Sequence, residues 1–72
     1  MREFADNLRA LRKQKGVLQK ELCQLLDITE RQYSRYEAGQ VDPPTSKTIA
    51  LADFFDVSID YLVGRSDVKE RR

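Results

Sequence analysis

The sequence predicts a compact all-α domain of five short helices within 72 residues. Three observations predict this class. Apolar residues recur at the three- and four-residue spacing of helices, capping residues precede helical segments, and glycines and prolines fall between the segments. Residues 57–61 alternate between apolar and polar as a strand would, but the capping signals on either side of them favour a helix.

The first predicted helix covers about residues 3–15. Its apolar residues Phe4, Leu8 and Leu11 fall within about 60° of one another on a helical wheel. We therefore expect one face of this helix to lie in the core. Gly16 is expected to end it, because glycine readily adopts the backbone conformation that follows a helix C-terminus.

Two further helices follow, joined by a tight turn at Asp27-Ile28. The first of the pair is predicted at residues 19–26. The second starts after Thr29, in a segment Thr29-Glu30-Arg31-Gln32 that fits a capping box. We expect the first helix to bury one apolar side, which is made of Leu22, Cys23, Leu25 and Leu26.

The helix that follows Thr29 has two different sides. Tyr33 and Tyr36 point inward on the wheel, whereas Arg31 and Arg35 lie on the opposite side. A capped, exposed helix with two forked guanidinium groups suits insertion into the major groove of DNA, where arginine pairs with guanine O6 and N7. The alternative interpretation is that both arginines are ordinary solvated charges.

Two prolines predict a loop at residues 40–44, because proline does not fit inside a helix. A fourth helix is predicted at residues 45–55, with Ile49, Ala52 and Phe55 turned inward.

Ser58 is predicted to cap a short fifth helix that ends at Gly64. Val57 and Leu62 have the spacing of a hydrophobic staple, in which the residue before the cap packs on the first turn. These two side chains are therefore expected in the core.

The formal net charge is +1, but the charges are unevenly distributed. Residues 1–35 hold eight Lys/Arg against five Asp/Glu, a net of +3, and residues 36–72 hold five against seven, a net of −2. A basic first half fits a localised anion-binding face. No apolar run approaches the roughly 20 residues that span a bilayer, and no signal-peptide pattern follows Met1, so a cytoplasmic location is expected.

The composition argues against an enzyme. The chain has no His and one Cys, with no phosphate-cradling glycine loop and no paired carboxylates in a plausible cleft. The same lack of ligands argues against a metal site, and we expect no cofactor or small-molecule ligand. Cys23 lies where two helices are expected to cross, so it is assigned a packing role rather than a redox role.

Many of these residues recur at the spacings of one known family. They are Phe4, Leu8, Leu11, Arg12, Gly16, Gln19, Glu21, Leu22, Ile28, Thr29, Ser34, Tyr36, Glu37, Gly39, Pro43, Leu51, Ala52 and the run from Val57 to Leu62. Over about residues 4–64 the chain resembles the lambda-repressor-like helix-turn-helix domains, often called the Xre family. That resemblance implies a fold of five helices whose third helix inserts into the major groove. It also implies that the protein binds palindromic operators as a dimer.

The resemblance also implies roles for individual residues. It implies that base edges are faced by Glu30, Arg31, Gln32 and Arg35, with Ser34 between them. Gln19 would hold a phosphate at the positive N-terminus of the second helix, and we assign the neighbouring Lys20 to DNA as well. Arg12 and Glu37 resemble the family's internal ion pair, which ties the first helix to the end of the third.

Three positions depart from the family pattern. Leu18 stands where Thr or Asn usually provides a side-chain cap worth about 1 kcal/mol. Asp27 stands where the tight turn usually has Gly, which tolerates unusual backbone angles better. The loop at residues 40–42 is Gln-Val-Asp, although relatives often have basic residues there. Either weaker contact with the DNA backbone or a different half-site geometry is therefore expected.

The C-terminal part of the chain has more apolar side chains than so small a core can bury, namely Phe54, Ile59, Tyr61 and Val63. Apolar side chains that stay exposed suggest a partner. The resemblance places the dimer contact at this end of the chain. We assign Ile59, Tyr61 and Val63 to a homodimer interface. A monomer with a few exposed apolar residues is the alternative.

These observations predict a sequence-specific DNA-binding transcriptional regulator of the phage or bacterial repressor type, which binds palindromic double-stranded DNA as a homodimer. The alternative is a protein-interaction module, such as an antitoxin or assembly factor, and the near-neutral charge and the acidic loop keep it open. Residues 1–64 are assigned to the DNA-binding domain. Residues 65–72 are assigned to a polar C-terminal tail, which is either a true terminus or the start of a linker.

Overall fold

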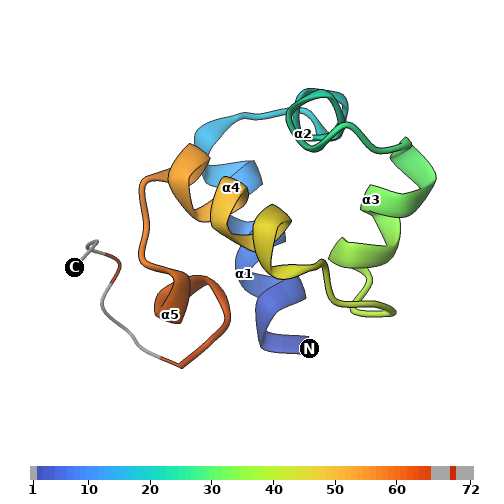
Figure 1. The fold of residues 1–72 in the computed structure, drawn as a ribbon. Helices are drawn as coiled ribbons and strands as arrows, with labels where there is room; N and C mark the ends of the chain where they lie inside the picture. Colours follow the sequence, from blue (N-terminus) through green and yellow to red (C-terminus); the bar gives the residue numbers. More distant parts are fainter. Residues whose placement is uncertain (1, 66–68, 70–72) are drawn as a thin grey trace.

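The computed structural model describes residues 2–65 and residue 69. Five helices follow one another along the chain, and the described residues contain no strand (Figure 1). The all-α, five-helix class predicted from the sequence is therefore confirmed. The helices are α1 (Arg2–Lys15), α2 (Gln19–Leu26), α3 (Glu30–Glu37), α4 (Thr45–Phe55) and α5 (Ile59–Leu62).

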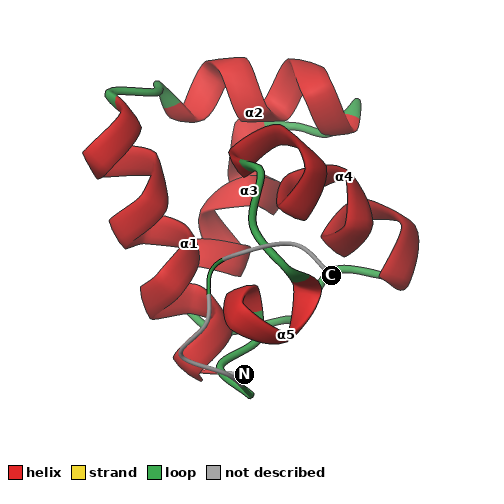
Figure 2. Cartoon of the chain, turned by 90° about the vertical axis from the view of Figure 1, so that its left-hand side faces the viewer, coloured by secondary structure: helices red, strands yellow, loops and turns green. Residues whose placement is uncertain are grey.

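α3 and α5 lie at opposite ends of the molecule, with α1 and α4 between them (Figure 1). Figure 2 shows α2 across the top of the molecule, and loops join each helix to the next. The core is formed where these helices face one another. It consists of Phe4, Ala5, Leu8, Leu11, Leu22, Cys23, Leu26, Tyr33, Tyr36, Leu51, Ala52, Phe55, Val57 and Leu62.

α1 buries the face that its spacing predicts, with Phe4, Leu8 and Leu11 all in the core. It ends at Gly16, whose φ of 66° lies in the left-handed region that costs glycine little. The Val17 N–H then donates to the Arg12 carbonyl at 3.0 Å, so one of the carbonyls left free at the helix end is satisfied.

The turn between α2 and α3 brings two caps close together in sequence. Asp27 adopts the left-handed conformation at the end of α2, with φ 56° and ψ 50°. The Thr29 hydroxyl accepts from the Gln32 N–H at 3.1 Å, which is one half of the predicted capping box. At the start of α2, Leu18 provides no side-chain cap, and the Glu21 carboxylate accepts from its N–H at 3.5 Å.

Two residues lie elsewhere than the helical wheel predicts. Leu25 and Ile49 were expected inside, but they are 44% and 41% exposed. In α4 the core position is taken by Leu51, which is fully buried, together with Ala52 and Phe55. The wheel is ambiguous here because apolar residues occupy nearly every side of α4, so periodicity cannot select the buried one.

α5 is short but anchored to the rest of the domain. The Ser58 hydroxyl accepts from the Tyr61 N–H at 3.0 Å, as the predicted cap requires. Val57 and Leu62 are both buried, which agrees with the predicted staple. The Asn7 side chain of α1 donates to the Tyr61 carbonyl at 2.9 Å. These contacts hold α5 against the start of the chain.

Candidate nucleic-acid interface

α3 presents two different faces. Tyr33 is fully buried and Tyr36 nearly so, and their rings meet edge to face with centroids 6.4 Å apart. Such pairs stabilise a core beyond their buried area. Within the described part of the chain the opposite face is left uncovered, and its exposed residues are Glu30, Arg31, Gln32, Ser34 and Arg35. All five residues expected to face base edges are thus exposed.

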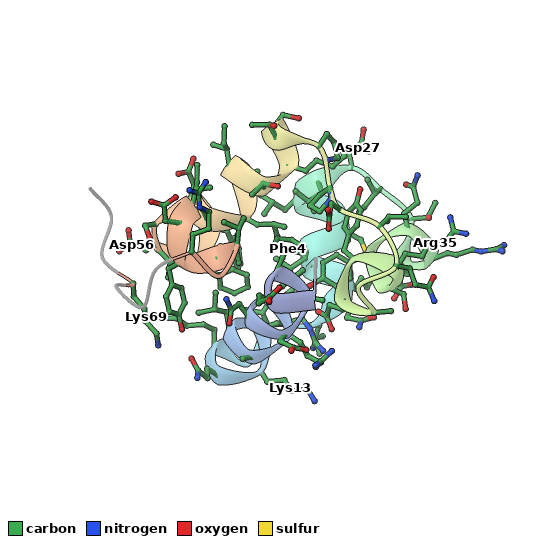
Figure 3. All side chains as sticks on the ribbon, turned by 90° about the horizontal axis from the view of Figure 1, so that it is seen from below. Phe4, Lys13, Asp27, Arg35, Asp56 and Lys69 are labelled. Atoms are coloured by element: carbon green, nitrogen blue, oxygen red, sulfur yellow. The ribbon has the colours of Figure 1, made fainter. Side chains whose placement is uncertain are left out.

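Three of these residues share a surface hollow. Arg31, Ser34 and Arg35 line it together with Ala38 and Gln40, and its volume is about 350 Å³. The Arg35 side chain extends from α3 away from the body of the protein (Figure 3). Two guanidinium groups therefore border a concave surface that contains a hydroxyl and an amide, all of which can hydrogen-bond to base edges or phosphate.

Gln40 was not among the residues predicted to contact DNA. Gly39 reverses the chain with a φ of 73°, and the Gln40 N–H then donates to the Arg35 carbonyl at 3.0 Å. This reversal returns Gln40 to the side of α3. The glycine that ends a helix was the available sequence signal, since the residue after such a turn folds back on the last helical turn.

The two residues expected at the start of α2 have different environments. Lys20 is exposed, whereas Gln19 is partly buried and its side-chain amide donates to Glu37 Oε1 at 3.3 Å. Gln19 is the first residue of α2, where backbone N–H groups without helical partners favour an anion. Gln19 thus lies at the N-terminus of α2, and its side chain is hydrogen-bonded to the last residue of α3.

Glu37 is the centre of a polar group that we call the Glu37 cluster, which consists of the buried Tyr33 and Glu37 and the partly buried Arg12 and Gln19. Arg12 Nε donates to Glu37 Oε2 at 2.6 Å, and Nη2 donates to Oε1 at 3.2 Å. The Tyr33 hydroxyl donates to Oε2 at 2.5 Å. The two residues expected to pair, Arg12 and Glu37, are therefore in two-pronged contact, with side chains only 15% and 6% exposed.

The cluster changes the ionisation of its members. Burial alone would raise the pKa of Glu37, but hydrogen bonds from Arg12 and Tyr33 outweigh it, and the pKa lies below its ordinary value. The hydrogen bond to Glu37 raises the pKa of Arg12. Burial, followed by the bond to Glu37, raises the pKa of Tyr33. Glu37 and Arg12 thus stay charged, and the tyrosine keeps its proton as a donor.

The end of α3 has a second guanidinium contact that the sequence analysis did not identify. Arg9 Nη1 donates to the Glu37 carbonyl at 2.9 Å, where a positive charge is favourable because helix C-terminal carbonyls are partly negative. Arg9 also pairs with Asp6 at 2.8 Å near the surface. Arg9 and Arg12 lie three residues apart on one face of α1, which was the available signal.

The three residues assigned to a dimer interface divide into two groups. Ile59 and Val63 line a mainly apolar hollow of about 250 Å³, whose other lining residues are Phe4, Asp42, Pro43, Thr45 and Thr48. Ile59 is 43% exposed. Tyr61 does not line this hollow, and its ring lies 5.6 Å from Lys69 Nζ. The structure therefore brings Ile59 and Val63 together at one surface, and Tyr61 is not part of that lining.

Cys23 lies on the buried side of α2, in the core. Burial raises the pKa of its thiol, which favours the unreactive protonated form. Among the described residues no group of three or more His, Cys, Asp or Glu is arranged to hold a metal ion. Within that same part of the chain, no helix combines the length and apolar character needed to cross a membrane.

Comparisons with known proteins give one consistent result. A family model described as "Helix-turn-helix" matches residues 8–62. The chain is 39% identical over 67 residues to the uncharacterized HTH-type transcriptional regulator YqaE of Bacillus subtilis, covering 92% of this chain and 58% of the relative. It is 34% identical over 68 residues to the HTH-type transcriptional regulator ImmR of the same organism, covering 94% and 54%.

A solved structure is also similar. The crystal structure of a transcriptional regulator from Listeria innocua matches with a TM-score of 0.83 and 38% identity, covering 89% of this chain and 60% of that chain. This chain thus spans little more than half the length of the relatives it matches. The relatives are regulators rather than enzymes, which agrees with the expectation from composition.

Proposed function

Because the chain belongs to the helix-turn-helix family, we propose that it is a sequence-specific DNA-binding transcriptional regulator that reads the major groove with α3. The observation that carries this proposal is the division of α3 between two buried tyrosines and an exposed face with Arg31, Ser34 and Arg35. A helix fixed on one side and bare on the other can enter a groove without rearrangement of the core.

In the proposed complex, some side chains contact bases and others contact phosphates. Arg31 and Arg35 are proposed to make two-pronged contacts with guanine, which arginine's planar fork fits. Gln32, Ser34 and Glu30 would face neighbouring base edges. Gln19 and Lys20, at the start of α2, would bind phosphate and fix the position of α3 without selecting a sequence.

We also propose that two copies bind a palindromic operator through the surface around α5. Ile59 and Val63 support this proposal because they line an apolar hollow at the surface with Phe4 and Pro43. Tyr61 would lie at the edge of this contact. A two-fold contact here would set two copies of α3 about 34 Å apart, which is one turn of DNA. Pairing would also multiply the affinity of a small module.

Repression by occupancy is the mechanism proposed for a bound dimer, since a protein seated on a promoter excludes polymerase. A protein-interaction module such as an antitoxin or assembly factor is the competing proposal. The near-neutral charge of +1 and the exposed Asp42 beyond α3 favour it, because both weaken attraction to phosphate.

A salt series separates these proposals. The chain is titrated into a labelled random duplex at 50 and 200 mM salt, and the slope of log affinity against log salt is measured. A DNA-binding domain releases about one counterion per phosphate contact, so a steep slope is expected. In vitro selection from random duplexes should then enrich a palindrome. A flat slope with no enriched sequence would reject DNA binding and favour the protein-interaction module.

A further inference from the structure

The hydroxyl of Tyr33 has a partner that core packing does not require. The Tyr33 side chain is fully buried, so its ring would fill the core equally well as phenylalanine. The hydroxyl nevertheless donates to Glu37 Oε2 at 2.5 Å, a short bond typical of a neutral donor with a charged acceptor. Since residue 33 cannot reach a ligand itself, its hydroxyl can act on a ligand only through its neighbours, and Glu37 is the one that accepts its hydrogen bond.

The Glu37 carboxylate receives four donors, which come from three helices. Oε2 accepts from Arg12 Nε and the Tyr33 hydroxyl. Oε1 accepts from Arg12 Nη2 and Gln19 Nε2. An ionised carboxylate offers about four lone-pair positions, so this set occupies them all. The carboxylate is therefore fixed in rotation as well as in position.

Gln19 is the member of the Glu37 cluster that is also placed to meet a phosphate, since it starts α2. A carboxylate can only accept hydrogen bonds, so the NH₂ end of the Gln19 amide must face Glu37. One amide hydrogen is used by Oε1, and the second remains to be directed at a ligand. Glu37 thus determines which end of the Gln19 amide is presented and at what angle.

We propose that Tyr33 is a positioning residue for DNA binding: its hydroxyl orients the Glu37 carboxylate, which presents a side-chain N–H of Gln19 to a DNA phosphate at the start of α2. This inference rests on the proposed function. Its weakest link is the Gln19 bond, which at 3.3 Å is the longest of the four. When the hydroxyl is removed, Oε2 keeps only its Arg12 donor, so the carboxylate is held less firmly about its contact with Arg12, and the long Gln19 bond is the first to be lost.

A double-mutant cycle tests the route. Wild type, Tyr33→Phe, Gln19→Ala and the double variant are titrated with a selected duplex and with a random duplex of equal length. Tyr33→Phe should weaken binding to both duplexes by the same factor, about three- to tenfold, as coupled neighbours do. With alanine at position 19 the same change should have no further effect. An equal loss in both backgrounds, or no loss with Gln19 present, would overturn the proposal.

A measurement without DNA separates positioning from general loss of stability. In the wild type, exchange of the Gln19 side-chain NH₂ protons, followed by NMR, should be slower than in the exposed Gln24 and Gln32. In Tyr33→Phe the three should become alike. Phe55→Leu, a core change in α4 outside the Glu37 cluster, should lower stability and leave the Gln19 signal as it is.

Different results would reject the proposed function and the positioning role of Tyr33. If the wild type binds neither duplex, the proposed function is rejected and this proposal with it. If the wild type binds but the Gln19 exchange rate is the same with Tyr33 and with phenylalanine, only the positioning role is rejected.

Discussion

Asp27 and Asp56 occupy equivalent positions at the ends of α2 and α4, with φ values of 56° and 54° in the left-handed region. Each is followed after one apolar residue by a hydroxyl cap, Thr29 for α3 and Ser58 for α5. The same type of connection thus occurs twice, and at each site an aspartate adopts a conformation that glycine tolerates better.

We expect Asp27→Gly to raise the free energy of unfolding by about 0.5–1 kcal/mol, because glycine relieves the left-handed backbone and removes a negative charge from a helix C-terminus. Urea denaturation followed by circular dichroism measures the change. Asp27→Ala is the matched control, which removes the charge but keeps a β-carbon, and it should be less stable than Asp27→Gly. A glycine variant less stable than the parent would contradict the argument.

Arg31→Ala and Arg35→Ala should each weaken binding to the selected operator by about 1–3 kcal/mol and relax preference at one base pair. Gln19→Ala should instead weaken operator and random duplexes alike. Fluorescence anisotropy with single-base operator variants makes the distinction. Lys13→Ala removes an exposed charge from α1, which Figure 3 shows on a different side from Arg35, and should retain sequence preference. Unchanged preference in both arginine variants would exclude α3 as the reading helix.

Arg12→Met should lower the free energy of unfolding by more than the roughly 0–1 kcal/mol typical of exposed pairs, because it leaves the buried Glu37 carboxylate without its cation. Asp6→Asn provides the comparison, since it breaks the more exposed pair with Arg9. Chemical denaturation of both variants measures the two costs. Equal costs would mean that burial of the Arg12–Glu37 pair has no energetic consequence.

Stability should fall in acid in a way that depends on Glu37. The folded state holds the pKa of Glu37 below its ordinary value of 4.5. As the pH falls below that value, the unfolded chain takes up the proton first, so the stability that this group contributes is present above about pH 4.5 and is lost on acidification. Urea midpoints from pH 7 to pH 3 should drop less steeply in Glu37→Gln than in the parent. Glu30→Gln, on the exposed face of α3, controls for the loss of one carboxylate.

Ile59→Glu and Val63→Glu should leave the helical fold intact and abolish cooperative binding to a palindrome, because each puts a charge into the apolar hollow beside α5. Phe54→Glu is the matched control, since Phe54 is 44% exposed, close to the 43% of Ile59, and it does not line the hollow. Analytical ultracentrifugation gives the association state. A wild type that stays monomeric at high concentration, with unaltered operator binding by both variants, would reject the dimer surface.

The helices were predictable because their signals are local. Gly16, Thr29 and Ser58 lie at helix ends, and a cap or a left-handed glycine depends on only a few neighbouring residues. The buried side of α3 was equally clear, because Tyr33 and Tyr36 are its large apolar residues.

Helical periodicity failed to predict the buried residues where apolar residues occupy several sides of a helix. In α4 the wheel selected Ile49, but the neighbouring helices cover Leu51, and which side is covered is a tertiary property. The Arg12–Glu37 contact joins residues 25 positions apart, so the family resemblance indicated it and periodicity could not. Tyr33 and Glu37 are one turn apart, a spacing that brings side chains together. The helical wheel predicted that the Tyr33 ring points inward, but it could not predict the hydrogen-bond partner of the hydroxyl.

The anchoring of α5 on α1 also constrains the order of folding. Asn7 contacts the Tyr61 carbonyl across 54 positions, and a β-carbon at Gly64 would lie 2.5 Å from the Glu3 β-carbon. Closing so long a loop carries an entropic cost that later contacts must repay. During synthesis, α1 to α3 therefore leave the ribosome before the segment that completes their core. A chain interrupted before Leu62 would therefore lack this anchor on α1, even though every residue proposed to face base edges is already present.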